Sequence, residues 1–561
     1  MVRIALCQAN LTVGDIDGNV QRIRAGIEHA CDHGAELIVF PELCVTGYPP
    51  EDLLLRSRFC EQAEAAVQQL ATNVQTAVVV IGYPHLSGSL FNSAAVLADG
   101  QVQAIYRKCL LPNYSVFDEK RYFASGDKGM VVNINGVAVG VTICEDLWHL
   151  DGPGKEAIVD GTTQLIVNLS ASPYHKGKGI EREELFRTRC QDYNCFIAFC
   201  NAVGGQDELV FDGHSLIISP TGDVLARGRQ FEEDLVITDI EVDRNLTTPP
   251  IATDQVTHVT LSTLNKAKPA FETPQRPPLL AEEAEVYRAL VLGTADYFSK
   301  NGFQKAVLGL SGGIDSAVSL VIAADALGPE AITAVSMPSR YTSDANRNDA
   351  SELAKQLGVN LLELPIHKLV TSYDETLTPL FHDTASNVAE ENLQARIRGN
   401  LVMALSNKFS WLVLTTGNKS EMSVGYATLY GDMAGGFSVL KDVLKTWVYR
   451  IAEWYNRNHE IIPRRIIEKA PTAELRENQL DTDSLPPYPE LDTILKAYVE
   501  DNLTLAEIKS LGFEEELVRR IVDMVDSAEY KRRQAPPGIR ITKRAFGKDR
   551  RLPITNKFST E

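Results

Sequence analysis

The chain has 561 residues, which is too long for one ordinary core and fits two large α/β units or three to four smaller ones. Its composition, 44% hydrophobic and 23% charged, is that of a globular protein and excludes a disordered chain, a collagen and a coiled coil. With 55 Lys and Arg against 74 Asp and Glu, the formal net charge of −19 argues against general binding of nucleic acid or anionic membranes. No apolar run approaches the roughly 18 residues of a membrane span, and the start, MVRIALCQAN, lacks the features of a signal peptide. We therefore expect a cytoplasmic protein.

Short apolar runs alternate with helical stretches over residues 1–243. Several of the runs are continuous and bounded by Gly, Pro or Asn, which is typical of strands covered on both faces. The predicted strands lie at 2–9, 36–42, 77–84, 93–98, 137–145, 164–170, 195–202, 215–220 and 235–242, and the predicted helices at 19–34 and 51–71. The pattern predicts an α/β unit with many strands.

A Pro- and Thr-rich segment at 244–278 has little periodicity and is predicted to be a linker. Residues 279–561 form a second predicted α/β unit, which ends in a basic tail at 531–551 with nine Lys or Arg and one Asp. Its predicted helices lie at 282–302, 317–328 and 346–358, and its strands at 305–310, 332–338 and 361–366. Strands that alternate with helices indicate a parallel sheet.

The loop GLSGGIDSA at 309–317 stands between an apolar strand and an apolar helix. Its glycines permit a tight turn, and the N–H groups of the helix start, with the Ser311 and Ser316 hydroxyls, would hold an anion. No GK[ST] follows, so this is not a Walker loop. Asp315 inside an anion-binding loop makes sense if the carboxylate holds Mg²⁺ beside phosphates.

SGGIDS resembles the signature of the PP-loop ATP pyrophosphatases, in which the loop grips the β,γ-pyrophosphate of ATP while a substrate atom attacks the α-phosphate. Within that group, the segments 391–400, 414–449, 469–475 and 530–533 are similar to those of NAD synthetases. The resemblance implies a Rossmann-like parallel sheet and a reaction that uses ATP with Mg²⁺. It also implies a dinucleotide acid, nicotinic acid adenine dinucleotide (deamido-NAD⁺), as the second substrate.

The same resemblance assigns roles to single residues of the second unit. The implied ATP contacts are Ser311, Gly312, Gly313, Asp315, Ser316, Thr416, Lys445 and Thr472; the implied contacts to deamido-NAD⁺ are Asn392, Arg396, Glu421 and Lys531; and the implied metal ligands are Asp315 and Glu421. Basic side chains suit a substrate with a carboxylate and a pyrophosphate. At Leu429, where ammonia-only synthetases have Lys, and at Gly436, where Asp is common, no contact is carried over.

Three charged or nucleophilic residues follow apolar strands in the first unit: Glu42 in FPELCVTG, Lys108 in YRKCLL and Cys144 in VTICEDLW. A Cys with a nearby base can act as a nucleophile, but a free thiol has a pKa of about 8.5 and needs help near neutral pH. Spacing alone does not bring the three together, and a buried structural Cys is the alternative. The nine cysteines include no CxxC pair, so no zinc or redox site is indicated.

These three contexts together resemble the nitrilase, or carbon–nitrogen hydrolase, family. The resemblance implies an αββα sandwich with Cys144 as the nucleophile, Glu42 as the general base and Lys108 as the oxyanion-stabilising group. Glu119 matches a supporting carboxylate. Among fused synthetases, the positions of Tyr114, Ser172 and Lys178 bind glutamine, and Tyr48 borders that pocket; the Lys178 position often holds Arg.

A nitrilase-like unit joined to a PP-loop synthetase is the architecture of the glutamine-dependent NAD⁺ synthetase family. It implies a ligase that takes ammonia from glutamine, since free ammonium is mostly protonated at pH 7 and not nucleophilic, and local delivery raises its concentration. The implied partners are glutamine, ATP, deamido-NAD⁺ and further copies of the chain, without nucleic acid or membrane. The alternatives are an amidase whose second half only binds nucleotides, a non-catalytic nucleotide sensor, and another ligase such as a GMP synthetase.

Overall fold

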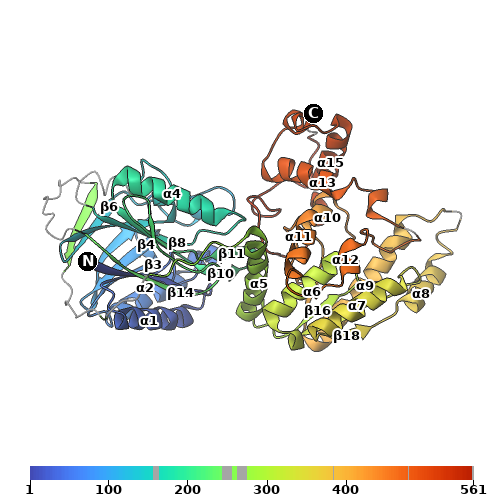
Figure 1. Cartoon of the computed structure of the whole chain (residues 1–561), viewed down its shortest axis with the longest axis horizontal. Coiled ribbons are helices and arrows are strands. Elements are labelled where there is room, and N and C mark those ends of the chain that lie inside the picture. Colours follow the sequence, from blue (N-terminus) through green and yellow to red (C-terminus); the bar gives the residue numbers. More distant parts are fainter. Residues whose placement is uncertain are drawn as a thin grey trace. The chain divides into compact units, whose positions relative to one another are not determined.

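The computed structural model describes residues 1–153, 155, 163–242, 255–261, 269, 274–382, 384–477 and 479–558. The chain divides into two compact units (Figure 1): the first comprises residues 1–206 and 210–280, and the second residues 281–561 with 207–209. The limits predicted from the sequence, 1–243, 244–278 and 279–561, stay predictions, because most of the segment 243–273 lies outside the described residues.

The described part of the first unit contains two large sheets and a small hairpin. The first sheet has the order β14 (Asp234–Ile240), β1 (Val2–Gln8), β2 (Leu37–Val39), β3 (Val78–Ser87), β4 (Ser89–Ala98) and β5 (Gln101–Arg107). The second has the order β13 (Val224–Arg227), β12 (Leu216–Ile218), β9 (Phe196–Asn201), β8 (Leu165–Ser170), β7 (Val137–Ile143), β6 (Gly129–Ile134) and β15 (Val256–Leu261). The hairpin pairs β10 (Val203–Gln206) with β11 (Leu209–Asp212).

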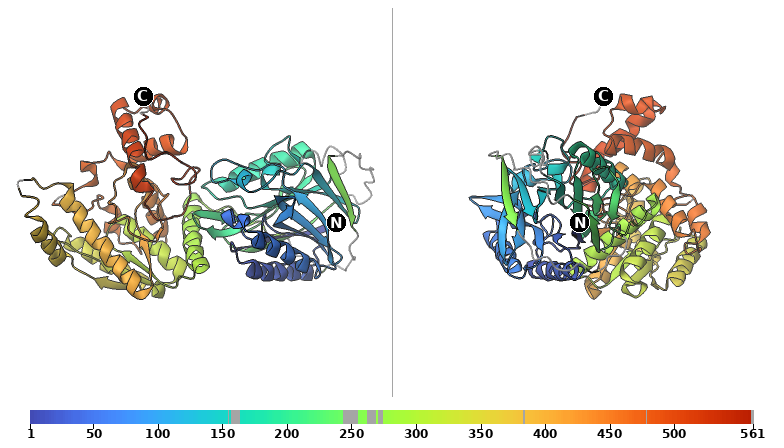
Figure 2. Two further views of the ribbon diagram at one scale, coloured as in Figure 1. Left: turned by 180° about the vertical axis from the view of Figure 1, so that it is seen from behind. Right: turned by 60° about the vertical axis from the view of Figure 1, so that its left-hand side comes forward.

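The two sheets pack face to face, and helices cover their outer faces. Successive residues of β1 point to opposite layers: Ile4 and Leu6 join the core between the sheets, whereas Ala5 and Cys7 pack with α1 (Ile16–Asp32) and α2 (Ser57–Ala71). The apolar face of α4 (Lys178–Tyr193) packs against the second sheet. Figure 1 shows α4 and α1 on opposite sides of the strands, and Figure 2 agrees. This is the αββα sandwich that the sequence predicts.

Three details of the first unit differ from the sequence-based expectation. The helix predicted at 51–71 is broken, because Arg56 is extended (φ −95°, ψ 107°) between the 3-10 turn η1 (Glu51–Leu55) and α2. A strand is predicted to end before Lys108, where the structure has β5, but no strand is predicted at β6, which lies between β7 and β15. The predicted linker contains β15, which pairs in parallel with β6 at a sheet edge.

The second unit is built on a parallel sheet with helices around it. The strand order is β18 (Asn360–Glu363), β17 (Ile332–Ser336), β16 (Ala306–Gly309), β19 (Leu412–Thr415) and β20 (Phe437–Ser438), and each neighbouring pair is parallel. The helices are α5 (Glu282–Asn301), α6 (Ile314–Leu327), α7 (Asp344–Leu357), α8 (His367–Leu377), α9 (Val388–Phe409), α10 (Lys419–Val424), α11 (Lys445–Tyr455), α12 (Arg464–Glu468), α13 (Tyr488–Leu495), α14 (Leu505–Ser510), α15 (Glu515–Ser527) and α16 (Glu529–Arg532).

The strand order reverses direction between β16 and β19, because the chain leaves β16 toward β17 and β18 and later returns to its other side. In open α/β sheets, ligands bind outside the carboxyl ends of the strands at such a switch point. The Gly-rich loop at 309–313 follows β16 there and leads directly into α6. The fold therefore places the predicted ATP loop at the crevice where a nucleotide is expected.

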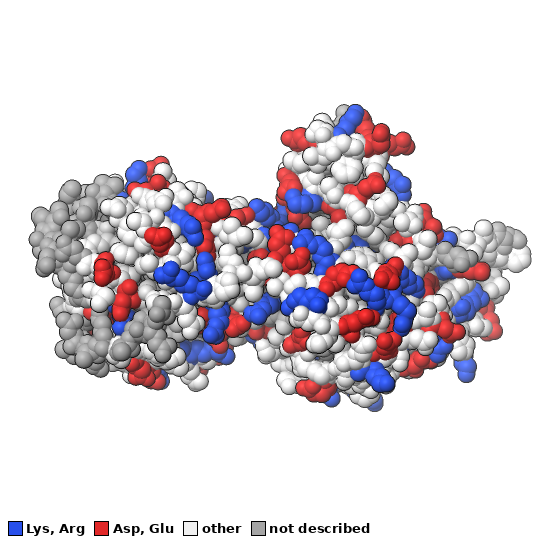
Figure 3. Space-filling view, in the orientation of Figure 1, with Lys and Arg blue, Asp and Glu red and all other residues white. Residues whose placement is uncertain are grey.

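The basic tail folds back onto the second unit. Buried Lys419 pairs with Asp442 and Glu500, each at 2.8 Å, and donates a hydrogen bond to Thr542 Oγ1 at 2.7 Å. Within the tail, Arg540 pairs with Asp549 at 2.6 Å. Acidic and basic side chains are interspersed over the described surface of each unit in the view of Figure 3. Of the helices that the structure describes, none has the length and apolar character needed to cross a membrane.

Candidate active sites

The first unit gathers the three predicted catalytic side chains at the carboxyl ends of strands. Glu42 follows β2 and Lys108 follows β5, two strands that run in the same direction in the first sheet. Cys144 follows β7 of the second sheet and begins the 3-10 turn η3 (Cys144–Leu147). Their exposed fractions are only 2%, 1% and 3%. The two packed sheets thus contribute to one buried site.

Glu42 and Glu119 converge on the Lys108 ammonium. Lys108 Nζ lies 2.6 Å from Glu42 Oε1 and 2.9 Å from Glu119 Oε1. Glu42 also accepts hydrogen bonds from Asn92 Nδ2 at 2.7 Å and from the Ala171 backbone N–H at 3.1 Å. Burial lowers the pKa of Lys108, but the two carboxylates outweigh it and hold that pKa well above its usual value. Lys108 therefore stays a cation in a dry site.

Cys144 lies in a strained turn, and two side chains of opposite charge, Glu42 and Lys108, act on its thiol. Its φ of 43° lies in the left-handed region that non-glycine residues seldom adopt. Burial raises the pKa of the Cys144 thiol well above its ordinary value, Glu42 raises it further, and Lys108 opposes the rise. The thiol is thus protonated at neutral pH and needs a base for its proton, a role that a carboxylate acting on it can fill.

The predicted glutamine-binding residues lie on three different elements. The Tyr114 hydroxyl, on an exposed loop, donates to Glu145 Oε2 at 2.9 Å. Buried Ser172, just after β8, donates its N–H to Asn201 Oδ1 at 2.9 Å. Lys178 begins α4, and its Nζ lies 4.1 Å from the centre of the Trp148 ring.

Burial and neighbouring charges act on the pKa of the Lys178 amine in opposite directions. Burial lowers the pKa of Lys178 to about 8, and nearby Arg182 lowers it further, while Glu181 at 3.6 Å opposes the shift. Two neighbours of this group, Glu145 and Trp148, were not singled out from the sequence. Both stand in CEDLW beside the nucleophile, so adjacency to Cys144 was the available signal.

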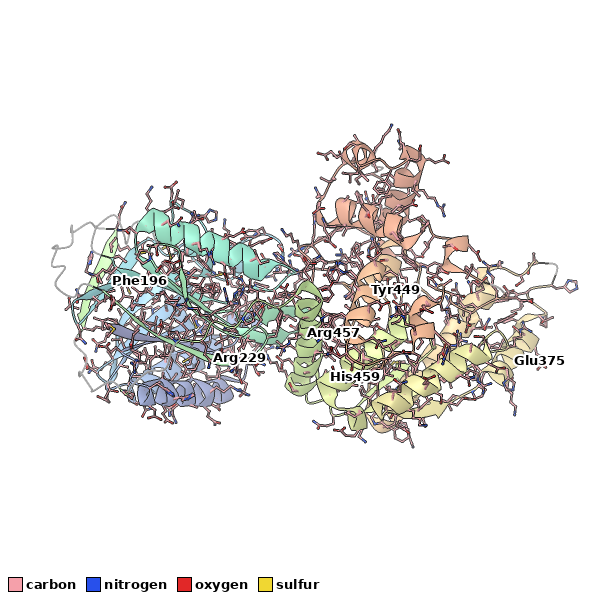
Figure 4. All side chains as sticks on the ribbon, in the orientation of Figure 1. Phe196, Arg229, Glu375, Tyr449, Arg457 and His459 are labelled. Carbon is pink, nitrogen blue, oxygen red and sulfur yellow. The ribbon has the colours of Figure 1, made fainter. Side chains whose placement is uncertain are left out.

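The second unit contains a cavity of about 690 Å³ at the end of its parallel sheet. Tyr449, labelled on α11 in Figure 4, is one of the lining side chains. Eleven predicted site residues also line the cavity: Ser311, Gly312, Gly313, Asp315, Ser316, Asn392, Thr416, Glu421, Lys445, Thr472 and Lys531. The structure brings together residues that are up to 220 positions apart in the sequence, from Ser311 to Lys531.

Of the site residues predicted for the second unit, Arg396 is not part of the described lining of this cavity. Its Nε donates to the Leu429 carbonyl at 3.2 Å, on the exposed side of α9. Arg398, two residues further along α9, does line the cavity and donates from Nε to the Met337 carbonyl at 3.1 Å. Burial lowers the pKa of Arg398 to about 10. The sequence could not separate the two arginines of QARIRG, because only the position of α9 decides which one faces inward.

The Gly-rich loop is shaped by close packing of its backbone. Gly312 has φ +80°, and a Cβ added to it would lie 2.3 Å from the Asn346 carbonyl oxygen. The Ser316 hydroxyl donates to the Gly313 carbonyl at 2.9 Å and lies 3.1 Å from the Ser311 hydroxyl. Gly313 precedes α6 as its N-cap and provides no side-chain cap, so the N–H groups of the helix start are available to an anion.

Asp315 and Glu421 meet at one lysine beside this loop. Lys445 Nζ lies 2.5 Å from Asp315 Oδ2 and 3.1 Å from Glu421 Oε1. Asn418 Nδ2 donates to Asp315 Oδ1 at 2.9 Å. Burial raises the pKa of Glu421, with Asp315 adding to the rise and Lys445 opposing it. Two carboxylates at the mouth of an anion-binding loop suit Mg²⁺, which combines one or two protein carboxylates with phosphate oxygens and water.

The two departures from ammonia-only synthetases have a visible setting. Leu429 contributes its carbonyl oxygen to Arg396. A Cβ added to Gly436 would lie 2.4 Å from Leu412 Cδ1, so the neighbouring strand leaves no room there for an acidic side chain without rearrangement. Among the described residues, groups of three or more His, Cys, Asp and Glu suited to a metal ion do not occur.

Comparison with known proteins agrees with both halves of this geometry. Residues 3–248 match the carbon-nitrogen hydrolase family, and residues 286–535 match the NAD synthase family. The glutamine-dependent NAD(+) synthetase of Thermotoga maritima is 48% identical over 570 residues, which covers 99% of each chain. That of Aquifex aeolicus is 44% identical over the whole of both chains.

A solved structure extends the match to three dimensions. The glutamine-dependent NAD+ synthetase of Acinetobacter baumannii, in complex with ADP, is 41% identical and superposes with a TM-score of 0.77. The match covers 100% of this chain and 99% of that one. The chain therefore belongs to the family of glutamine-dependent NAD(+) synthetases, the ligases that form NAD⁺ with nitrogen from glutamine.

Proposed function

We propose that the first unit releases ammonia from glutamine at Cys144 and that the second unit uses it to amidate deamido-NAD⁺ activated by ATP. The observation that carries this proposal is the buried group of Glu42, Lys108 and Cys144, in which a protonated thiol lies under a carboxylate and a lysine cation. Without a base the thiol would be inert, and without a cation the oxyanion would be unstabilised.

In the glutaminase half, Glu42 accepts the thiol proton while Cys144 Sγ bonds to the amide carbon of glutamine. Lys108 stabilises the negative oxygen of the tetrahedral intermediate. The C–N bond then breaks, Glu42 returns the proton to the departing nitrogen, and ammonia leaves a thioester on Cys144. Water, losing a proton to Glu42, attacks the thioester; glutamate departs, and that proton restores the thiol.

The surrounding side chains match the ends of free glutamine. The Lys178 cation at the start of α4 complements the α-carboxylate, and the Glu145 carboxylate, held by the Tyr114 hydroxyl, complements the α-ammonium. Ser172 contributes a buried polar group after β8. A pair of opposite charges next to the nucleophile favours an amino-acid amide over a simple amide.

In the synthetase half, the loop 311–316 and the start of α6 hold the β- and γ-phosphates of ATP. The carboxylate of deamido-NAD⁺ attacks the α-phosphorus, and the bond to pyrophosphate breaks, which leaves an acyl adenylate. Ammonia bonds to the acyl carbon, AMP departs with the acyl C–O electrons, and loss of one proton completes the amide of NAD⁺.

Charged residues of the cavity complement these substrates. Asp315 and Glu421 would hold Mg²⁺, which supplies positive charge to neutralise the triphosphate. Lys445, whose pKa is held above its usual value by these two carboxylates, supplies a fixed cation beside the loop. Arg398 and Lys531 add positive charge to the lining, and both suit an anionic dinucleotide.

We also infer that the protein self-associates in solution. Several large apolar side chains of the second unit are exposed around α8 and the ends of α9, namely Leu369, Tyr373, Leu380, Val388 and Phe409. Exposed large apolar side chains of this kind are candidates for an interface between copies of the chain. The molar mass measured by light scattering should exceed that of one chain.

The test of the division of labour is Cys144→Ala in the full chain. We expect loss of glutamine-driven NAD⁺ formation, because the nucleophile is gone, and near-normal NAD⁺ formation from added ammonium. Cys31→Ala, which removes a thiol from α1, should leave both activities unchanged. Persistence of glutamine-driven synthesis in Cys144→Ala would contradict the assignment of the nucleophile.

The second readout is the fate of ATP. The loop chemistry predicts AMP and pyrophosphate in equal amounts with NAD⁺, whether glutamine or ammonium supplies the nitrogen. ADP and inorganic phosphate as the first products would contradict the proposed role of the loop while leaving the glutaminase assignment intact.

A further inference from the structure

Asp146 lies two residues after the nucleophile and is completely buried. Its carboxylate accepts four hydrogen bonds. Oδ1 accepts from the backbone N–H groups of Cys109 at 3.1 Å and Leu110 at 2.8 Å. Oδ2 accepts from the Tyr106 hydroxyl at 2.8 Å and from the Ile143 N–H at 3.1 Å. These bonds make Asp146 more than a packed side chain.

The four donors stand on both sides of the catalytic pair. Cys109 and Leu110 directly follow Lys108, at the end of β5 in the first sheet, whereas Ile143 directly precedes Cys144, at the end of β7 in the second. Tyr106 belongs to β5 itself. One carboxylate therefore ties together two strand ends from different sheets, each of which carries a catalytic residue.

The turn that Asp146 holds is strained. The left-handed region is unfavourable for a non-glycine residue, and such conformations persist where the surroundings fix them. Cys144 has this conformation, with φ 43°. The hydrogen bond from the Ile143 N–H to Asp146 closes the turn around Cys144. Asn168, on β8, donates from Nδ2 to the Cys144 carbonyl oxygen at 3.3 Å.

The charge of Asp146 suits this role. Burial raises the pKa of Asp146 to about 6, and the Leu110 N–H, the Lys108 cation and the other donors oppose the rise. Each carboxyl oxygen accepts two hydrogen bonds, which is the pattern of the ionised form. An ionised carboxylate accepts at both oxygens. An asparagine has only one acceptor oxygen. Its NH₂ group would replace the second carboxylate oxygen and would face two hydrogen-bond donors. The environment thus requires Asp and is not satisfied by its isostere.

We propose that Asp146 is a positioning residue of the glutaminase, which fixes Lys108 and Cys144 relative to each other without touching glutamine. This inference rests on the proposed glutaminase site. It predicts a defect in the chemical step rather than in substrate binding, because the four hydrogen bonds of Asp146 go to Tyr106, Cys109, Leu110 and Ile143. The side chains assigned to glutamine are others: Tyr114, Glu145, Ser172 and Lys178. Misplacement of a catalytic group by about 1 Å is enough to lower a rate about 100-fold.

The experiment compares Asp146→Asn with Asp239→Asn in the full chain. Asp239 lies on β14 and pairs with Arg3. Its substitution makes the same chemical change elsewhere in the first unit. We expect kcat for glutamate release to fall about 100-fold in Asp146→Asn, with KM for glutamine within about threefold of wild type. Asp239→Asn should keep both constants. Ammonium-driven NAD⁺ formation should be unchanged in both, which shows that the second unit is intact.

A glutaminase kcat within threefold of wild type in Asp146→Asn would overturn the proposal, and so would a defect confined to KM. If Asp146→Asn does not fold, Tyr106→Phe keeps the test open, because it removes one of the four donors and no backbone group. We expect its kcat to fall by about 3- to 10-fold at constant KM, the equivalent of one hydrogen bond; an unchanged kcat would refute the proposal.

Cys144→Ala, assayed in parallel, separates this inference from the function on which it rests. If Cys144→Ala retains glutamate release, the proposed nucleophile is wrong. If Cys144→Ala loses glutamate release while Asp146→Asn and Tyr106→Phe keep it, the nucleophile stands and the positioning role alone is wrong.

Discussion

Two opposite charges act on the Cys144 thiol, and their separate removal should shift its reactivity in opposite directions. Glu42 raises the pKa of the thiol, so Glu42→Gln should lower that pKa; Lys108 lowers it, so Lys108→Met should raise it. Because the thiolate is the species that reacts, the pH midpoint of alkylation should fall in the first variant and rise in the second. The rate of iodoacetamide labelling at Cys144 relative to wild type, followed by peptide mass spectrometry from pH 6 to 10, reports this shift, because more thiolate at a given pH gives faster labelling.

Both variants should nevertheless lose glutamine hydrolysis, by about 100- to 10,000-fold for the general base. Cys144→Ala provides the blank for labelling at the other eight cysteines. A shift of the midpoint in the same direction in both variants would contradict the assigned charges, since a carboxylate and an ammonium cannot act alike on one thiol.

Lys178 offers a prediction about pH that concerns binding rather than chemistry. Its pKa is lowered to about 8, chiefly by burial, so the cation is lost as the pH rises through 8. If this cation binds the α-carboxylate of glutamine, KM for glutamine should rise by about tenfold between pH 7 and 9. Lys178→Arg stays charged over this range and should give a flatter profile. Identical profiles in the two proteins would exclude Lys178 as the titrating group.

At the residue scale, the resemblance to the carbon–nitrogen hydrolase family led to Glu42, Lys108 and Glu119, and the structure places all three in one ion-paired group. Spacing in the sequence could not have done this, because Glu42 is 66 positions from Lys108. No role for Asp146 is predicted from the sequence, for a related reason. Its importance lies in contacts to backbone N–H groups, which any residue type supplies and which therefore leave no mark in the sequence.

At the scale of single elements, the Gly-rich loop tests whether backbone shape controls ATP use. In Gly312→Ala, a methyl group would meet the Asn346 carbonyl oxygen at 2.3 Å, in a left-handed conformation. The loop must shift, and we expect ammonium-driven NAD⁺ formation to fall about 100-fold. Glutamate release measured without ATP should stay near the wild-type rate, since the first unit is untouched.

Gly302→Ala is the matched control for this loop variant. Gly302 has φ +76° at the end of α5, but a Cβ there meets nothing within 4 Å. It carries only the strain of the left-handed conformation, about 1–2 kcal/mol, and should lower the melting temperature slightly while preserving activity. Equal loss of activity in both variants would show that strain, and not contact with Asn346, is responsible.

Element prediction succeeded where apolar runs were continuous and failed where they were mixed. The succession of β16, the Gly-rich loop and α6 is predictable because a short apolar strand directly precedes glycines and an apolar helix. β5 reads QVQAIYR, and most of its residues are only partly buried at a sheet edge, so only its end before Lys108 is predicted and its start is not. β15 follows a Pro- and Thr-rich segment whose composition is typical of a linker, and its pairing with β6 is a long-range contact.

At the scale of the whole molecule, fold class and family were accessible from the sequence, because each half carries its own motif. The boundary between the halves was less accessible. The segment 244–278 contributes β15 and then, through Gln275, a carbonyl that accepts a hydrogen bond from the Arg227 N–H. A stretch that looks like a tether by composition is therefore partly built into the first unit, where neighbouring strands supply the order that its own residues do not.

Two catalytic halves in one chain lead to the final prediction, which concerns their coupling. Glutamine hydrolysis without a waiting acceptor loses nitrogen to solvent as ammonium, so we expect ATP and deamido-NAD⁺ together to stimulate glutamate release. A coupling free energy of about 1–3 kcal/mol acting on binding would give about 5- to 150-fold stimulation. Because Lys419 links α10, which carries Glu421, to the tail through Thr542, we expect the tail to respond when these ligands bind.

The measurement has two arms, glutamate release with and without both synthetase substrates, and transfer of ¹⁵N from amide-labelled glutamine into NAD⁺ against excess unlabelled ammonium. Coupled sites should give stimulated release and NAD⁺ enriched in ¹⁵N well above the bulk ratio. Lys419→Met should reduce the stimulation while the basal glutaminase rate, set by the first unit, stays constant. Equal release in both conditions, with the label diluted to the bulk ratio, would show that the two units work independently although they share one chain.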